Sequence, residues 1–203
     1  MKSKLEKLRN TCIGIAGCGG LGSNCAMALA RAGVGRLVIA DFDTVTPENL
    51  GRQYYFRDQV GQKKVLALRE NIRRVNPDID VQVHDVCLGP DEVLHIFKDC
   101  QVIVEAFDRA DMKLMIIETV SERFPDKFII AGSGLAGYGG NNELRTRRLG
   151  NLFICGDETS EVSEELPPLA PRVGVVAALQ ANQVLEIVMD DMEPASGDDV
   201  WDE

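Results

Sequence analysis

The first residues with recognisable chemistry form a glycine-rich turn near the N-terminus. An apolar run at residues 11–16 predicts a buried strand before the turn, and the Ala-rich residues 21–32 predict a helix after it. Glycine allows a sharp turn and a close approach of the backbone to a ligand, and the start of a helix offers free N–H groups to an anion. The sequence therefore predicts a phosphate-binding turn that contains four glycines: Gly17, Gly19, Gly20 and Gly22.

An acidic residue follows the next predicted strand, residues 36–40. Asp41 stands about 20 residues beyond the turn, where a carboxylate can accept hydrogen bonds from the hydroxyls of a nucleotide ribose. A glycine turn, a helix and an acid in this order also fit an NAD-dependent oxidoreductase. These features predict a nucleotide site without identifying the nucleotide.

Charged side chains further along the chain favour a nucleoside triphosphate. Ligands of an open parallel sheet bind beyond the carboxyl ends of the strands, and we expect Arg52, Lys64 and Asp108 at that edge. The two cations can neutralise β- and γ-phosphates, and Asp108 can hold Mg²⁺. A redox dinucleotide has little need for these charges. Two alternatives stay open, since the cations could be solvated surface charges and Asp108 could cap a helix.

Strand-like and helix-like blocks alternate through most of the chain. This alternation predicts an α/β fold: a Rossmann-like nucleotide-binding parallel sheet with helices on both faces. Residues 143–148 and 151–155 predict a hairpin, so we expect a few antiparallel strands to extend the sheet. The remaining blocks predict strands at 79–83, 101–106 and 127–131 and helices at 61–75, 91–97, 110–123 and 173–189.

The chain has 203 residues and a formal net charge of −10. Its length fits one domain, which we place at residues 1–189, followed by an acidic tail, 190–203, that we expect to be disordered. The negative charge makes a general nucleic-acid surface unlikely, because phosphate neutralisation needs clustered Lys and Arg. No segment predicts a signal peptide or a membrane span, so we expect a cytoplasmic protein.

Six cysteines are present, and none forms a C-x-x-C pair. No structural zinc is therefore expected. Cys155 has two interpretations: a buried strand thiol, which we favour, or a thiol that forms a covalent intermediate.

The joint motifs resemble one family. GCGGLG, ADFD, ENLGRQ, GQKK and FD occur in this order, and APRVGV begins the last predicted helix. This set resembles the ThiF/MoeB/HesA family, the bacterial relatives of ubiquitin-activating enzymes, and the resemblance covers about residues 10–189. The chain looks most like the short ThiF-type members.

The resemblance implies an activity. It implies that ATP adenylates the C-terminal glycine carboxylate of a small ThiS-like sulfur carrier protein, for thiamine synthesis, with release of pyrophosphate. It also implies Mg²⁺ and a homodimer. Arg52, Lys64 and Asp108 would be catalytic, and Asp108 would bind the metal. The nucleotide would be contacted by the four glycines together with Asp41, Asn49, Arg52, Gln53, Lys64, Asp108 and Arg109.

The chain departs from the family pattern at three places. The zinc-binding cysteine pairs of many relatives are missing. Arg109 stands where the family has an asparagine after the strand-end aspartate, and Arg9 is the only arginine in the place of the N-terminal arm that reaches a partner's ATP in many relatives. Three alternatives remain: adenylation of another carrier or of a tRNA base, an NAD-dependent oxidoreductase, and a non-enzymatic scaffold that binds a carrier.

Overall fold

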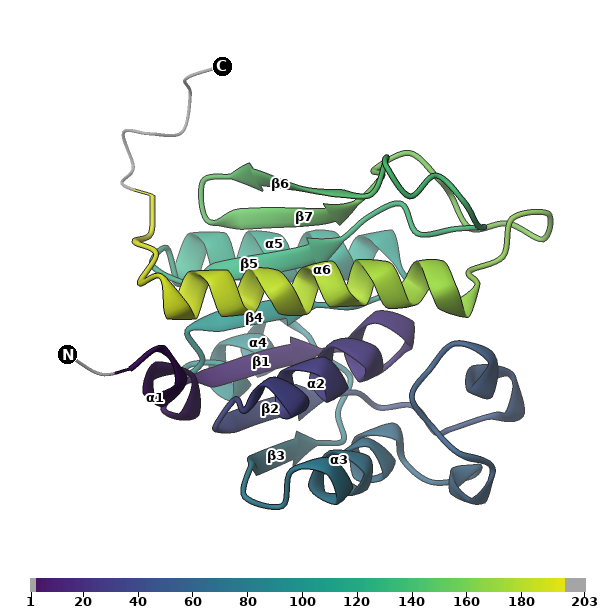
Figure 1. Ribbon diagram of the computed structural model, residues 1–203, viewed down its shortest axis with the longest axis horizontal. Helices are drawn as coiled ribbons and strands as arrows, with labels where there is room; N and C mark the ends of the chain where they lie inside the picture. The colour runs from purple at the N-terminus through teal and green to yellow at the C-terminus, as the bar shows by residue number, and fades with distance from the viewer. Residues whose placement is uncertain (1–2, 196–203) are drawn as a thin grey trace.

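The computed structural model describes residues 3–195 and contains, within them, one seven-stranded sheet (Figure 1). The strand order is β3-β2-β1-β4-β5-β7-β6. Neighbouring strands are parallel, apart from β6, which runs antiparallel to β7. The strands are β1 (Cys12–Ala16), β2 (Arg36–Ala40), β3 (Asp80–His84), β4 (Val102–Glu105), β5 (Phe128–Gly132), β6 (Arg145–Leu149) and β7 (Leu152–Gly156).

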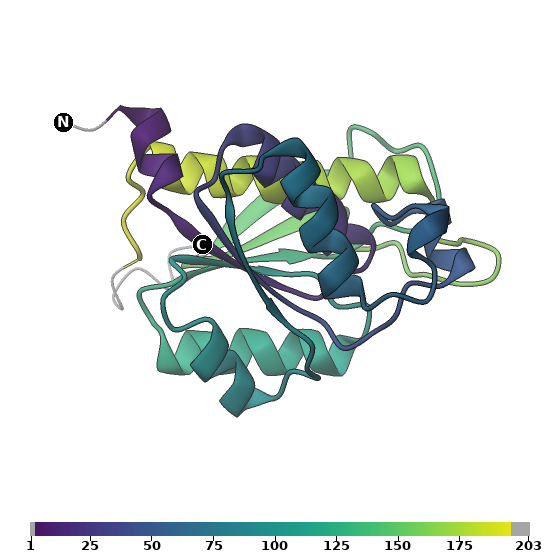
Figure 2. The ribbon, with the colours of Figure 1, turned by 90° about the horizontal axis from the view of Figure 1, so that it is seen from below.

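Helices cover both faces of the sheet (Figure 2). One face carries α1, α2, α3 and α6, and the opposite face carries α4 and α5. The predicted Rossmann-like α/β fold is therefore confirmed. The helices are α1 (Lys4–Arg9), α2 (Gly20–Ala32), α3 (Lys64–Val75), α4 (Pro90–Ile96), α5 (Ala110–Arg123) and α6 (Ala170–Met189), with short 3₁₀ helices η1 (Pro47–Gly51) and η2 (Arg57–Gln59).

Three local features differ from the sequence prediction. Helix α1 was not expected, and it is held by a capping box in which Ser3 and Glu6 bond each other's backbone N–H groups. Helix α3 begins at Lys64 rather than at residue 61, because Gly61 and Gln62 form backbone hydrogen bonds with Val45 and Lys63 forms an antiparallel bridge with Thr44. Only β6 of the predicted hairpin is antiparallel to the sheet, since β7 pairs in parallel with β5.

The end of the described chain lies against α1 and the β6–β7 hairpin. Lys4 Nζ lies 2.5 Å from Asp190 Oδ1, Lys7 pairs with Asp191, and Ala195 N donates to Asn151 Oδ1 at 2.7 Å. The rest of the tail that we expect to be disordered, residues 196–203, lies outside the described residues. Among the described helices, none is long and apolar enough to cross a membrane.

The strand order reverses between β1 and β4, and the carboxyl ends of these two strands mark the reversal point at one edge of the sheet. In open α/β sheets ligands bind at this reversal. The loop 41–63 lies on the β2 side of it, and the segments after β5 and β7 lie on the other side (Figure 1). Helices α2 and α6 lie side by side, and both begin at this edge.

Two apolar layers, one on each face of the sheet, hold the strands. On the α4–α5 face Phe97 is fully buried, and its ring fills the space beside Gly14 of β1. We expect Phe97→Ala to lower the free energy of unfolding by about 3–5 kcal/mol, because it removes a large apolar side chain and leaves a cavity. Leu114→Ala on the same face, where Leu114 is 57% exposed, is the control and should change stability by less than about 0.5 kcal/mol. Chemical denaturation measures both, and equal losses would contradict this packing.

Candidate functional site

The glycine turn connects β1 to α2 by close backbone contacts. Gly17 has φ of 95°, and its N–H donates to the carbonyl of Ala40 at 2.9 Å. A Cβ on Gly22 would overlap the carbonyl oxygen of Gly17, and a Cβ on Gly17 would lie 2.8 Å from the carbonyl oxygen of Ala106. Glycine is therefore required at both positions, and the turn brings the N-terminus of α2 to the end of β1. That N-terminus has no side-chain cap, because its N-cap is Gly19, so its N–H groups suit an anion.

Asp41 lies directly beside the turn. Its carboxylate accepts hydrogen bonds from the backbone N–H of Cys18 at 2.6 Å and of Asp43 at 2.7 Å. Burial raises the pKa of the Asp41 carboxyl above its ordinary value, although these N–H groups and the Lys64 ammonium act in the opposite direction. The acid expected at the ribose therefore stands where β2 ends, next to the predicted phosphate site.

Lys64 places a buried ammonium at the same edge. The side chain is 7% exposed, and Nζ lies 2.7 Å from Asp43 Oδ2. Tyr55 fixes this arrangement, because its hydroxyl donates to the carbonyl of Cys18 in the turn at 2.7 Å and lies 3.4 Å from that of Lys64. Lys64 is thus held beside the turn by structure, unlike an ordinary solvated surface charge. Asp43 was absent from our predicted site, although the motif ADFD contains it.

The loop after η1 lies over the first turn of α2. Asn24 of α2 donates to the carbonyl of Arg52 at 3.0 Å, and Arg52 Cγ lies 3.9 Å from the position of a Cβ at Gly20. Gln53 Oε1 is buried and has no hydrogen-bond partner among the described residues. Asn49 uses Oδ1 to accept the N–H of Thr46 at 3.0 Å. The structure therefore brings Arg52 and Gln53 to the glycine turn, whereas the Asn49 oxygen caps its own 3₁₀ helix.

Asp108 and Arg109 are exposed and follow β4. The ring of Phe107, one residue before Asp108, lies 3.4 Å from the position of a Cβ at Gly17, so Asp108 stands next to the turn. Helix α5 has Arg109 as its N-cap residue, with no side-chain cap bond, so Asp108 does not cap it. Arg109 Nη2 lies 2.5 Å from Asp111 Oδ2. Arg109 therefore binds the first turn of α5 in this structure.

Two further buried ion pairs at the carboxyl edge were not predicted. Glu105, at the end of β4, is fully buried, and Lys113 Nζ lies 2.9 Å from its Oε2 and 2.9 Å from the carbonyl oxygen of Gly132. Burial raises the pKa of Glu105, and Lys113 opposes this shift. Arg172 Nη2 pairs with Asp157 Oδ2, and both side chains are 5% exposed. No pattern in the sequence indicates either pair, because the two partners of each pair lie on different structural elements.

Cys155 lies inside the sheet. The side chain is fully buried, burial raises the pKa of its thiol, and its Sγ lies 3.5 Å from Thr146 Oγ1. A reactive cysteine needs a lowered pKa and access to solvent. The geometry favours the buried strand thiol over the covalent intermediate.

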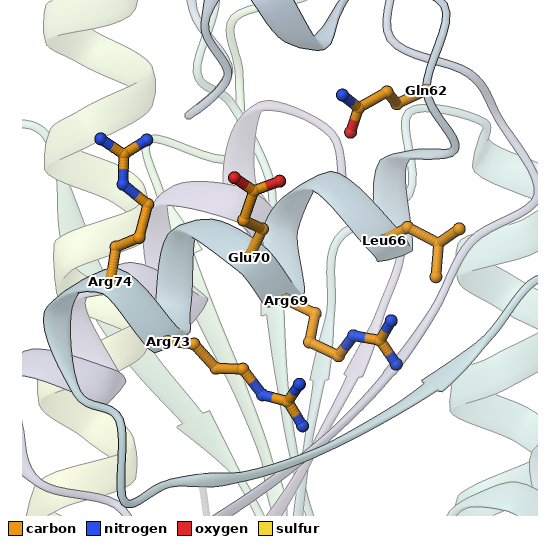
Figure 3. A pocket seen from close by; sticks show the side chains of 6 residues that line it. All are labelled: Gln62, Leu66, Arg69, Glu70, Arg73 and Arg74. Atoms are coloured by element: carbon orange, nitrogen blue, oxygen red, sulfur yellow. The ribbon is translucent and has the colours of Figure 1, made fainter.

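A separate hollow of 460 Å³ lies on the outer face of α3 (Figure 3). The side chains of Arg69 and Arg73 extend to the same side of the helix, and Arg74 extends away from them. The hollow is lined by Gln62, Leu66, Arg69, Glu70, Arg73 and Arg74. None of these residues belongs to the predicted site.

Comparison with known proteins identifies relatives over nearly the whole chain. The model of the ThiF family matches residues 1–201. The chain is 33% identical over 193 residues to the adenylyltransferase and sulfurtransferase MOCS3 of Caenorhabditis briggsae, covering 90% of this chain and 46% of that protein. It is 30% identical over 201 residues to the molybdopterin-synthase adenylyltransferase of Salmonella typhimurium, covering 95% of this chain and 78% of that protein. The chain thus spans less than half of the first relative.

Solved structures share the fold. Escherichia coli tRNA N6-threonylcarbamoyladenosine dehydratase, TcdA, in complex with ATP, superposes with a TM-score of 0.85 at 21% identity, covering 93% of this chain and 89% of that chain. Escherichia coli MccB with ATP gives a TM-score of 0.72 at 23% identity, covering 94% and 59%. At these identities the likeness concerns the fold.

Close packing at the turn predicts that a methyl group cannot be added there. We expect Gly22→Ala to destabilise the protein by about 1–3 kcal/mol or more, because the new Cβ would overlap Gly17. Gly174→Ala, on α6, is the matched control: nothing lies within 4 Å of its Cβ position, and alanine in a helix stabilises by about 0.5–1 kcal/mol. Thermal unfolding of both variants checks the contrast, and a tolerated Gly22→Ala would disprove the tight turn.

Proposed function

The chain belongs to the ThiF family, and we propose that it is an ATP-dependent adenylyltransferase that activates the C-terminal carboxylate of a small ubiquitin-like sulfur carrier protein. One observation carries the proposal: the Lys64 ammonium is buried against Asp43, beside Asp41 and the glycine turn. A cation held at this place suits a triphosphate better than a redox dinucleotide. The relatives named adenylyltransferases support the same activity.

The reaction divides among the residues of the carboxyl edge. The carrier carboxylate attacks the α-phosphorus of ATP, a new O–P bond forms, and pyrophosphate leaves with the electrons of the broken P–O bond. The glycine turn and the N-terminus of α2 would bind the phosphates, and Asp41 would accept hydrogen bonds from the ribose hydroxyls. Arg52 and Lys64 would stabilise the charge that grows on the leaving pyrophosphate. Catalysis would thus come from positioning and from fixed charge.

Asp108 fits a magnesium ion by its chemistry. It is exposed beside the turn, and no hydrogen bond or ion pair occupies its carboxylate among the described contacts. Mg²⁺ is commonly bound by one or two carboxylates together with the phosphates of the substrate. The ion would supply further positive charge to the phosphates there.

The carrier itself is the finer part of the proposal. The short ThiF-type motifs favour a ThiS-like carrier of thiamine synthesis, whereas the relative from Salmonella typhimurium is named for molybdopterin synthase. The fold of TcdA, which acts on tRNA by its name, leaves a tRNA base as the alternative, and the net charge of −10 disfavours it. A homodimer and a cytoplasmic location remain parts of the same proposal.

Removing either cation should slow adenylation. We expect Lys64→Ala and Arg52→Ala to lower carrier-dependent ATP–pyrophosphate exchange by roughly 10²–10³-fold, as loss of one preorganised charge does in other enzymes. Lys63→Ala is the matched control for Lys64, since Lys63 is about half exposed and pairs with Asp85 at 3.0 Å. Arg57→Ala, at an exposed position, is the control for Arg52. Near-normal exchange in both site variants would remove the roles assigned to these cations.

Mass spectrometry would identify the substrate. After incubation with ATP–Mg²⁺, a ThiS-like carrier ending in Gly-Gly should gain the mass of AMP, because the acyl-adenylate retains the α-phosphate. A carrier with its last glycine deleted is the control and should stay unmodified. NAD in place of ATP should give no adduct and no thermal stabilisation, and stabilisation by NAD alone would favour the oxidoreductase.

A further inference from the structure

One buried ion pair joins three segments at the carboxyl edge. Arg172 lies in the first turn of α6, and its Nη2 pairs with Asp157, which directly follows β7. Its Nη1 donates to the carbonyl of Gly139, in the segment that follows β5. The side chains of Arg172 and Asp157 are both 5% exposed. This contact is called the Arg172 clamp below.

The Arg172 clamp adjoins the glycine turn. Val173, the next residue of α6, places Cγ1 3.0 Å from the position of a Cβ at Gly20. Helices α6 and α2 begin side by side at the same edge (Figure 1). The clamp therefore borders the phosphate site on the β5–β7 side, opposite to the loop that carries Arg52 and to Lys64 at the start of α3.

The chemistry of the proposed reaction gives this side a role. In a phosphoryl-type displacement the attacking and leaving oxygens lie roughly in line. If pyrophosphate leaves toward Arg52 and Lys64, the attacking carboxylate approaches from the opposite side. The segments on that side are 133–140 after β5 and 157–160 after β7.

These two segments depend on Asp157 for their shape. Four glycines of the first segment have positive φ, namely Gly134, Gly137, Gly139 and Gly140. Such a segment has few side chains to hold it. Asp157 Oδ1 accepts the N–H groups of Thr159 and Ser160, both at 2.8 Å, and Ser160 Oγ accepts the N–H of Ala136 at 3.2 Å.

The charge of Asp157 is secured by its surroundings. Burial acts to raise the pKa of Asp157, but hydrogen bonds from Ser160, Thr159 and Arg172 outweigh it and hold that pKa well below its ordinary range. One donor of the guanidinium is unused, because Arg172 Nε is buried and has no acceptor among the described residues. The clamp is therefore a fixed ionic link between α6 and the two segments, which are also joined to each other by the backbone bonds Asp157 N–Gly134 O and Glu158 N–Ser133 O, both at 3.1 Å.

We propose that Arg172 is a positioning residue for the acyl substrate: with Asp157 it holds residues 133–140 and 157–160 as the wall along which the extended C-terminal tail of the carrier reaches the α-phosphorus. This inference rests on the proposed adenylation. An extended, glycine-ended tail needs a narrow path lined by backbone, and a glycine-rich wall provides one. Tyr138, 83% exposed on this wall, offers the tail an aromatic surface before it enters the site.

The test distinguishes an effect on binding of the carrier from an effect on binding of ATP. In carrier-dependent ATP–pyrophosphate exchange with a ThiS-like carrier ending in Gly-Gly, we expect Arg172→Met to raise KM for the carrier at least tenfold and to leave KM for ATP within twofold. Arg172→Lys keeps a positive charge beside Asp157 but loses the second guanidinium nitrogen, which donates to Gly139. Its KM for the carrier should therefore lie between the values of the wild-type enzyme and of Arg172→Met. A merely structural role would lower the amount of active enzyme, and so kcat, without separating the two KM values.

Arg148→Met is the matched control. Arg148 is an exposed arginine of β6 whose Nε donates to the carbonyl of Gly150 at 2.8 Å, in the hairpin turn and outside both segments, so both KM values should stay unchanged. If Arg172→Met does not fold, Arg172→Lys alone decides the question. An unchanged KM for the carrier in the folded Arg172 variants, or an equal rise for ATP, would overturn the inference while the proposed function stands. A wild-type enzyme without any carrier-dependent exchange would instead overturn the proposed function, and the inference with it.

Discussion

The contact of Gly22 with the carbonyl of Gly17 is the constraint on which the site depends. Only a residue without a Cβ lets the first turn of α2 approach β1 this closely. The approach places uncapped N–H groups at the point where the strand order reverses. Asp41 is then bonded to the same turn through the N–H of Cys18, and Tyr55 ties the turn to the start of α3. The backbone geometry of this turn thus fixes the position of the nucleotide site, independently of the charged side chains around it.

Charge is added to this frame by ion pairs at the carboxyl ends of three strands, and each pair has at least one buried partner. Lys64 with Asp43 stands after β2, Lys113 with Glu105 after β4, and Arg172 with Asp157 after β7. Each pair keeps a cation in place at the carboxyl edge of a protein whose net charge is −10. A buried pair is weak evidence of stability, because the desolvation of both ions offsets their attraction. Their common position at one edge is better explained by the ligand chemistry of that edge.

The carboxyl edge has two unlike sides. The β2 side holds Arg52 on a loop that Tyr55 and Asn24 bond in place, and Lys64 at the start of α3. The β5–β7 side is rich in glycine, and its shape depends on Asp157 and Arg172. This asymmetry suits a reaction with two different substrates, in which a nucleotide occupies one side and an extended peptide approaches from the other.

The sequence by itself determined the glycine turn and the order of the strands and of the helices other than α1, because hydrophobic periodicity and turn residues act locally. The family followed from the resemblance of its motifs to a known set. The sequence also placed Asp41, Arg52 and Lys64 at one edge, since parallel strands end together. The tertiary structure alone decided that Lys64 is buried against Asp43, that the Asn49 oxygen caps η1, and that Arg109 binds Asp111. It alone joined Arg172 to Asp157, 15 residues apart. These pairings depend on how loops from separate strands pack together, and no periodicity in the chain encodes that packing.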